Sequence, residues 1–272
     1  MHEFKYDEQC MGTVFSFKGN SPFDASATRH ILEQACDILV EADRTFSLYK
    51  PNSPLSKLAR GEHSLADCPP VVEEIWDACE AWEKTTDGWF SAFTPQNTFD
   101  PSGIVKTWAA KAAADFIFEQ GIQDFTMNAG GDVWISDLAV QDVDWRVGLH
   151  KPVSIASPDA GVLAVIDLKG TEFRAVCTSG VAERGEHIWN PKAPGKEAAN
   201  QLLQVSVVAK DLVEADVWAT AAFAHGPRAI RQINEHNLAH PDNQVQAIVV
   251  LPDGDLNATD GFLELFAKPD QQ

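Results

Sequence analysis

Residues 103–136 read GIVKTWAAKAAADFIFEQGIQDFTMNAGGDVWIS, and the spacing of their apolar side chains changes partway along. Over Gly103–Gln120 the apolar residues recur at helical intervals, which predicts a helix that Gly121 ends. They are Val105, Trp108, Ala109, Ala112, Phe116 and Ile117. Two short runs that follow, Phe125–Asn128 and Asp132–Ser136, flank a Gly-Gly pair and are typical of a β-hairpin. A long helix that leads directly into antiparallel strands indicates an α+β fold.

The rest of the chain differs on the two sides of residues 103–136. Before this segment we expect one strand, Met11–Phe17, and three helices: Asp24–Asp43, a short one opened by Ser53-Pro54, and Val71–Thr85. After it we expect mainly strands, at Trp145–Leu149, Val162–Leu168, Phe173–Thr178, Leu202–Ala209, Gln246–Leu251 and Phe262–Phe266, with helices near Val213–Ala224 and Arg228–His236. The prediction is a helix-rich N-terminal half packed on a largely antiparallel or mixed β-sheet core, in one domain over residues 1–272.

The charge of the chain restricts its partners. With 21 basic and 40 acidic residues the formal net charge is -19, which repels nucleic acid and anionic membranes. A nucleotide ligand would need a metal, a helix N-terminus or a lysine to offset this negative charge locally. The five cysteines include no C-x-x-C pair and indicate reduced thiols. Because the first residues lack the apolar core of a signal peptide, a lipid-attachment motif and any membrane-spanning run, we expect a cytoplasmic protein.

A first candidate site is the pair Asp216 and Thr220 on the predicted helix Val213–Ala224. Residues four apart share a helix face, so the carboxylate and the hydroxyl point the same way. Hard cations such as magnesium prefer oxygen ligands, often one or two carboxylates completed by substrate phosphates. The ordinary alternative, an acidic residue that complements the dipole near a helix start, fits the same spacing.

A second candidate is the start of the long helix, where Asp100, Ser102, Gly103 and Lys106 come together. Asp100 and Ser102 are plausible N-caps. In addition, a Ser-Gly turn lets the backbone approach a ligand closely, and the unpaired N–H groups of a helix N-terminus bind phosphate. Lys106 lies one residue off the apolar stripe and can face the same opening. Elsewhere, His187 is a candidate acid–base group, because an imidazole titrates near neutrality.

Eight short motifs stand in a fixed order between residues 11 and 226. They are Met11-Gly12-Thr13, Ser47–Leu58, Asp100–Lys106, Asn128–Asp132, Trp145–Gly148, Thr178-Ser179-Gly180, His187–Pro191 and Ala215–Thr220. Each is weak alone. As an ordered set they resemble the ApbE family, the FAD:protein FMN transferases.

The resemblance implies a set of roles. Met11 and Tyr49 would contact the flavin or adenine part of FAD, and Asp100, Lys106 and Ile188 would contribute to its pocket. Magnesium would be held by the Gly103 carbonyl, Asp216 and Thr220, with FAD phosphate oxygens completing its shell. FAD would be the substrate, and its FMN would pass to a Thr or Ser hydroxyl of a target flavoprotein, releasing AMP. His187 is the candidate base, and Asp216 is its rival.

Two departures from the family pattern bear on the site. Thr107 stands where the family has Gly, and we expect it to narrow the space beside the cofactor. The loop Asn190–Gly195 lacks one carboxylate and one hydroxyl of the family pattern. Three other functions remain open on the sequence: a magnesium-dependent FAD pyrophosphatase that releases FMN and AMP, a non-catalytic FAD-binding protein, and a purely structural domain.

Overall fold

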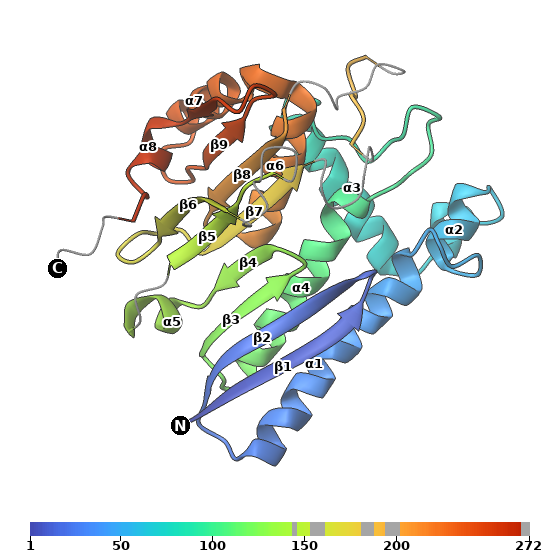
Figure 1. Ribbon diagram of the computed structural model, residues 1–272. Helices are drawn as coiled ribbons and strands as arrows, with labels where there is room; N and C mark the ends of the chain where they lie inside the picture. The colour runs from blue at the N-terminus through green and yellow to red at the C-terminus, as the bar shows by residue number, and fades with distance from the viewer. Residues whose placement is uncertain (143–145, 153–160, 181–187, 194–201, 268–272) are drawn as a thin grey trace.

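The computed structural model describes residues 1–142, 146–152, 161–180, 188–193 and 202–267. Within these residues eight strands form one large sheet and two more form a small sheet. Figure 1 shows the large sheet running from the N-terminal hairpin to the C-terminal elements. Each pair of neighbouring strands among the described residues is antiparallel. The predicted α+β class with a largely antiparallel sheet is confirmed, whereas the extent of the domain stays a prediction.

The strands of the large sheet come from both halves of the chain. Their order is β1 (His2–Cys10), β2 (Thr13–Ser21), β3 (Asp124–Ala129), β4 (Asp132–Ile135), β7 (Ala175–Gly180), β8 (Gln204–Ala209), β9 (Gln246–Val250) and β10 (Leu256–Ala258). The small sheet pairs β5 (Arg146–His150) with β6 (Val162–Asp167). Every residue of β8 and β9 is buried, so these strands lie at the centre of the fold.

Two strand predictions are wrong. Met11 and Gly12 are the turn of the β1–β2 hairpin and not the start of a strand: both have positive φ, 52° and 73°, as a two-residue type I′ turn requires. The predicted strand Phe262–Phe266 lies instead at helix α8 (Asp260–Leu263) and the turn after it. There Phe262 and Leu265 are buried and Leu263 is exposed, a spacing of three that suits a helical turn.

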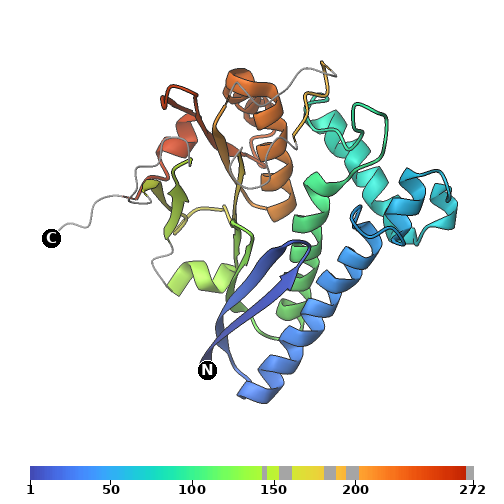
Figure 2. The ribbon, with the colours of Figure 1, turned by 45° about the vertical axis from the view of Figure 1, so that its right-hand side comes forward.

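Three helices form a layer on one face of the large sheet, as Figures 1 and 2 show. They are α1 (Ala25–Phe46), α4 (Ser102–Glu119) and α6 (Leu212–His225). Helix α4 packs between the other two and against β3, while α6 packs on β7 and β8. The remaining helices are α2 (Pro54–Ala59), α3 (Pro70–Thr85), α5 (Asp137–Asp142), α7 (Ala229–Ala239) and the 3₁₀ turns η1 (Leu65–Asp67) and η2 (Gly226–Arg228).

Helix α4 is buried on more faces than its predicted single apolar stripe implies. Ala110 and Ala114 lie outside that stripe and are fully buried, and so is Thr107. A helix in contact with a sheet and two other helices has little solvent-facing surface. Its alanines let the neighbouring elements approach closely.

Local sequence signals fix the helix starts. Asp24, Ser53 and Asp211 each accept a hydrogen bond from a backbone N–H of the first turn of α1, α2 and α6. In α2 the expected Ser-Pro start is confirmed, with Pro54 in the first helical position. No helix in the described part of the chain combines the length and apolar character that a membrane crossing needs.

Candidate functional site

The N-terminus of α4 forms one wall of a pocket. Pro101 is the N-cap, so neither Asp100 nor Ser102 takes that place, contrary to expectation. Asp100 nevertheless acts on the first turn, because its Oδ1 accepts a hydrogen bond of 3.0 Å from the Ser102 N–H. The Asp100 N–H in turn donates to the Ala92 carbonyl at 2.7 Å, which ties the helix start to the preceding loop.

Gly103 lies where a side chain would not fit easily. A Cβ at this position would come within 3.2 Å of the Phe90 ring and 3.7 Å of Thr220 Cγ2. The missing side chain therefore allows the first turn of α4 to sit directly beside α6. Gly103 and Thr220 line the same pocket.

Helix α6 presents Asp216 and Thr220 to this pocket, as their four-residue spacing predicts. Asp216 is only 6% exposed, so it is not the solvated helix-start acid of the ordinary alternative. The Thr107 hydroxyl of α4 donates a hydrogen bond of 2.8 Å to Asp216 Oδ2. Thr107 itself is buried and is not among the residues that line this pocket. The expectation that it narrows the space beside the cofactor stays a prediction.

Lys106 connects α4 to the Asn128–Asp132 hairpin. Its ammonium donates to Asp132 Oδ2; the Asp132 side chain is buried, and the Lys106 side chain is 16% exposed. Asp132 Oδ1 also accepts the N–H of Thr178 from β7, at 3.0 Å. Burial on its own would lower the pKa of Lys106, but the charges of Asp132 and Asp216 outweigh it and hold that pKa above its usual value. Lys106 is therefore a fixed cation at the pocket.

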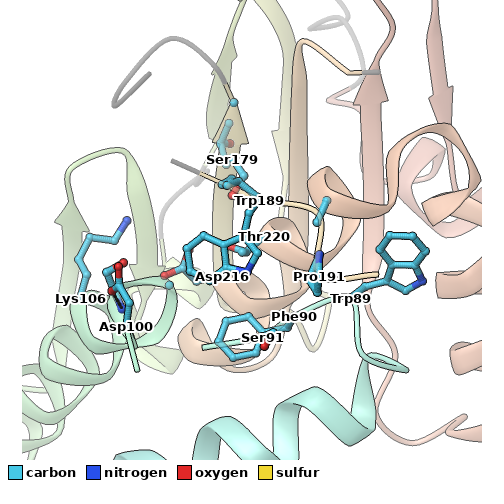
Figure 3. A pocket seen from close by; sticks show the side chains of 16 residues that line it. Trp89, Phe90, Ser91, Asp100, Lys106, Ser179, Trp189, Pro191, Asp216 and Thr220 are labelled. Carbon is cyan, nitrogen blue, oxygen red and sulfur yellow. Dashed lines mark hydrogen bonds between the residues drawn. The ribbon is translucent and has the colours of Figure 1, made fainter. Parts of the chain in front are cut away.

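The opposite wall is largely aromatic. It contains Trp89 and Phe90 from the segment after α3, together with Ile188, Trp189 and Pro191. Figure 3 shows Asp100 and Lys106 on one side of the cavity, Trp89 and Pro191 on the other, and Asp216 and Thr220 between them. The Trp89 ring stacks on His225, with 4.0 Å between centroids, and the Lys192 ammonium lies 4.8 Å from its centre.

A second pocket adjoins the first and is much larger, with a volume of ≈ 730 Å³ against ≈ 80 Å³. Met11 and Tyr49 line it, and Asp100, Ser102 and Lys106 line both pockets. Tyr49 is 98% exposed, so its ring stands at the mouth and not in the interior. The two cavities therefore meet at the N-terminus of α4.

The structure thus gathers most of the predicted site residues. Gly103, Ile188, Asp216 and Thr220 line the first pocket, Met11 and Tyr49 line the second, and Asp100 and Lys106 are common to both. His187 lies outside the described residues, and its role stays a prediction. Sequence reasoning did not foresee two connections: the ion pair of Lys106 with Asp132, and the hydrogen bond of Thr107 to Asp216. Both join residues far apart in the chain, and no local spacing marks them.

Comparisons with known proteins agree with this geometry. The chain is 26% identical over 147 residues to a FAD:protein FMN transferase of Escherichia coli (strain K12), and 27% over 178 residues to one of Vibrio cholerae. These matches cover 51% and 62% of the chain but only 40% and 48% of the relatives, so the chain matches less than half of their length.

Solved structures share the fold. The ApbE protein of Thermotoga maritima has a TM-score of 0.78 at 20% identity, covering 98% of this chain and all of the other. The flavinyl transferase ApbE of Pseudomonas stutzeri has a TM-score of 0.77 at 19% identity, covering 98% of each chain. The sequence model of the ApbE family matches residues 91–248, which contain the α4 start, the Asn128–Asp132 hairpin and α6. The chain belongs to the ApbE family.

Proposed function

We propose that this protein is a magnesium-dependent FAD:protein FMN transferase, which moves FMN from FAD to a Thr or Ser hydroxyl of a target flavoprotein. One observation carries the proposal. The Gly103 backbone, Asp216 and Thr220 meet in one pocket, and that pocket continues into a larger one across Asp100 and Lys106. The names of the matched relatives support the same reaction.

The chemistry of the donor set fits magnesium. A backbone carbonyl, a carboxylate and a hydroxyl are all hard oxygen ligands, and magnesium commonly takes a few such ligands together with substrate phosphates. The absence of a side chain at Gly103 keeps its backbone within reach of Thr220. Magnesium bound there would supply neutralisation of the pyrophosphate charge during transfer.

The pair of cavities fits a long dinucleotide. Its pyrophosphate would lie at the junction, close to the N-terminus of α4 and to Lys106, and its two ends would occupy the two pockets. The ion pair with Asp132 positions the Lys106 ammonium, which has three N–H donors and keeps others for a phosphate.

In the proposed transfer, the acceptor hydroxyl attacks the FMN phosphorus, the bond from that phosphorus to the bridging oxygen breaks, and AMP leaves with that oxygen. The hydroxyl proton passes to a base on the protein, for which His187 remains our candidate. Asp216 is the poorer base, because its carboxylate accepts the Thr107 hydrogen bond and would bind the metal. The protein supplies mainly position and electrostatic stabilisation.

The test uses purified protein with FAD, magnesium and a flavoprotein domain that carries an acceptor Thr, separated on a denaturing gel. We expect in-gel flavin fluorescence on the target. Free FMN and AMP without labelling would show a pyrophosphatase instead, and neither product would leave only FAD binding.

The Asp216→Ala variant should lose labelling, while Asp115→Ala, which removes an exposed carboxylate of α4 away from both pockets, should keep it. Full labelling by Asp216→Ala would overturn the assignment of the metal site.

A further inference from the structure

Thr107 occupies an unusual position for a helical threonine. It is fully buried in the second turn of α4, and its hydroxyl contacts Asp216, which is 109 residues further along the chain. It stands one residue after Lys106 and four after Gly103. Nothing in its own helix requires a hydroxyl there, since burial alone favours an apolar side chain.

The Thr107 hydroxyl has one proton and two acceptors within reach. Its Oγ1 lies 3.2 Å from the Ile104 carbonyl and 2.8 Å from Asp216 Oδ2. Bonding to a carbonyl of the preceding turn is the ordinary choice of a buried helical threonine. Because a hydrogen bond to an ionised acceptor is shorter and stronger, the Thr107 hydroxyl donates its hydrogen bond to the Asp216 carboxylate.

This hydrogen bond belongs to a matched pair of contacts between α4 and α6. Gly103 lies beside Thr220, and Thr107 lies beside Asp216. Each helix contributes two residues four apart, and the order is reversed between them, so the two helices run antiparallel at this point. The contact at one end holds the Gly103 backbone next to the Thr220 side chain, and the contact at the other end holds the carboxylate.

We infer that Thr107 is a positioning residue for Asp216: its hydroxyl holds Oδ2 and so fixes the rotation of the carboxylate that faces the pocket. The Asp216 carboxylate is then already held in one orientation at the pocket where a divalent cation would bind. The inference rests on the proposed function, because it takes Asp216 as a magnesium ligand. Loss of such a supporting hydrogen bond typically weakens metal affinity about 10–100-fold.

Three variants separate the hydroxyl from the volume of the side chain. Thr107→Val keeps the shape and removes the donor, Thr107→Ser keeps the donor and removes a methyl group, and Thr107→Ala removes both. Thr28→Val is the matched control. Thr28 is also buried in a helix and its hydroxyl donates to the Ser21 hydroxyl at 2.7 Å, but it lines neither pocket.

The measurement is a titration of each protein with Mn²⁺ in the presence of saturating FAD, followed by electron paramagnetic resonance of the free ion. It does not depend on turnover. We expect Thr107→Val and Thr107→Ala to bind Mn²⁺ about 10–100-fold more weakly than the wild type. Thr107→Ser and Thr28→Val should bind within about threefold of it. If Thr107→Val does not fold, the comparison of Thr107→Ala with Thr107→Ser isolates the hydroxyl equally well.

The outcomes distinguish the inference from the function on which it rests. If the Thr107→Val, Thr107→Ala and Thr107→Ser variants all bind Mn²⁺ as tightly as the wild type, the positioning role is overturned and the metal site stays in place. A fall in affinity for Thr107→Ser as large as that for Thr107→Ala would also overturn it, because packing and not the hydroxyl would then matter. If the wild-type protein binds no Mn²⁺ with FAD present, the proposed metal centre fails and the inference fails with it.

Discussion

A single methyl group at Gly103 should damage the site more than the fold. In Gly103→Ala the new Cβ would press against the Phe90 ring at 3.2 Å and approach Thr220 Cγ2 at 3.7 Å, so Phe90 must give way by a few tenths of an ångström. Alanine is also the better helix former, by up to about 1 kcal/mol, which offsets part of this strain. We expect a thermal midpoint within about 4 °C of the wild type and Mn²⁺ affinity at least about tenfold lower.

Thermal unfolding and the Mn²⁺ titration check these two expectations separately. Unchanged metal affinity in Gly103→Ala would mean that the Gly103 backbone has no part in the cation site. A large fall in stability would instead mean that Phe90 cannot move, and would show Gly103 to be a packing position.

At the same scale, the sequence predicted site residues that share a helix face and missed those that meet across elements. Asp216 and Thr220 were predicted because four-residue spacing is a property of one helix. The contacts of Lys106 with Asp132 and of Thr107 with Asp216 span 26 and 109 residues. They depend on how α4 docks against the sheet and against α6, and local sequence does not contain that information. From the sequence alone, Thr107 in place of the family's Gly suggests only less space beside the cofactor. The structure adds that the Thr107 hydroxyl donates a hydrogen bond to Asp216.

At the scale of elements, Asp132 joins α4, β4 and β7. It pairs with Lys106 of α4 and accepts the Thr178 N–H of β7, and it is 2% exposed. Replacing it by Asn keeps a group that can accept the Thr178 hydrogen bond but removes the nearer of the two carboxylates, Asp132 and Asp216, that balance the Lys106 charge. We expect Asp132→Asn to lower the free energy of unfolding by about 3–5 kcal/mol, measured by urea denaturation.

The double variant Lys106→Met with Asp132→Asn provides the control. It removes the unpaired charge, so it should recover much of the stability that the single variant loses. Equal stability of the single and double variants would contradict the view that the buried charge is the cause.

The elements that the sequence predicted best are those with strong local signals. Helix α2 begins at its Ser-Pro pair, and α4 ends within one residue of the expected position. The strands that were missed, β1 and β10, each pair with one neighbour at an edge of the sheet. Most positions of β1 carry polar or charged side chains, and β10 has only three residues, so neither contains a strong apolar pattern. Helix α8 was mistaken for a strand because a single helical turn and a short strand contain similar apolar runs.

On the scale of the whole molecule, the negative charge of the chain opposes the binding of the anionic ligand that we propose for the site. The formal net charge is -19, yet the proposed ligand carries a pyrophosphate. At the pocket, a helix N-terminus and Lys106 lie on one side, and the oxygen atoms proposed to bind magnesium lie on the other. Since Lys106 is already paired with Asp132, we expect the proposed metal to supply most of the local positive charge. Binding of FAD should therefore depend on the metal in a way that salt reveals.

Without a divalent cation, FAD approaches a net-negative protein, and its affinity should rise as salt screens the repulsion. The Debye length falls from about 30 Å at 0.01 M to about 10 Å at 0.1 M salt. At the lower salt concentration charges across the whole protein repel FAD, whereas at the higher one only charges near the pocket do. With saturating magnesium the pyrophosphate binds beside a fixed cation, and added salt should weaken binding or leave it unchanged. Flavin fluorescence titrations at several NaCl concentrations, with EDTA and with magnesium, measure both slopes. If FAD affinity in EDTA falls as NaCl rises, Lys106 and the helix N-terminus dominate the local potential, and the metal is not needed to overcome the charge of the chain.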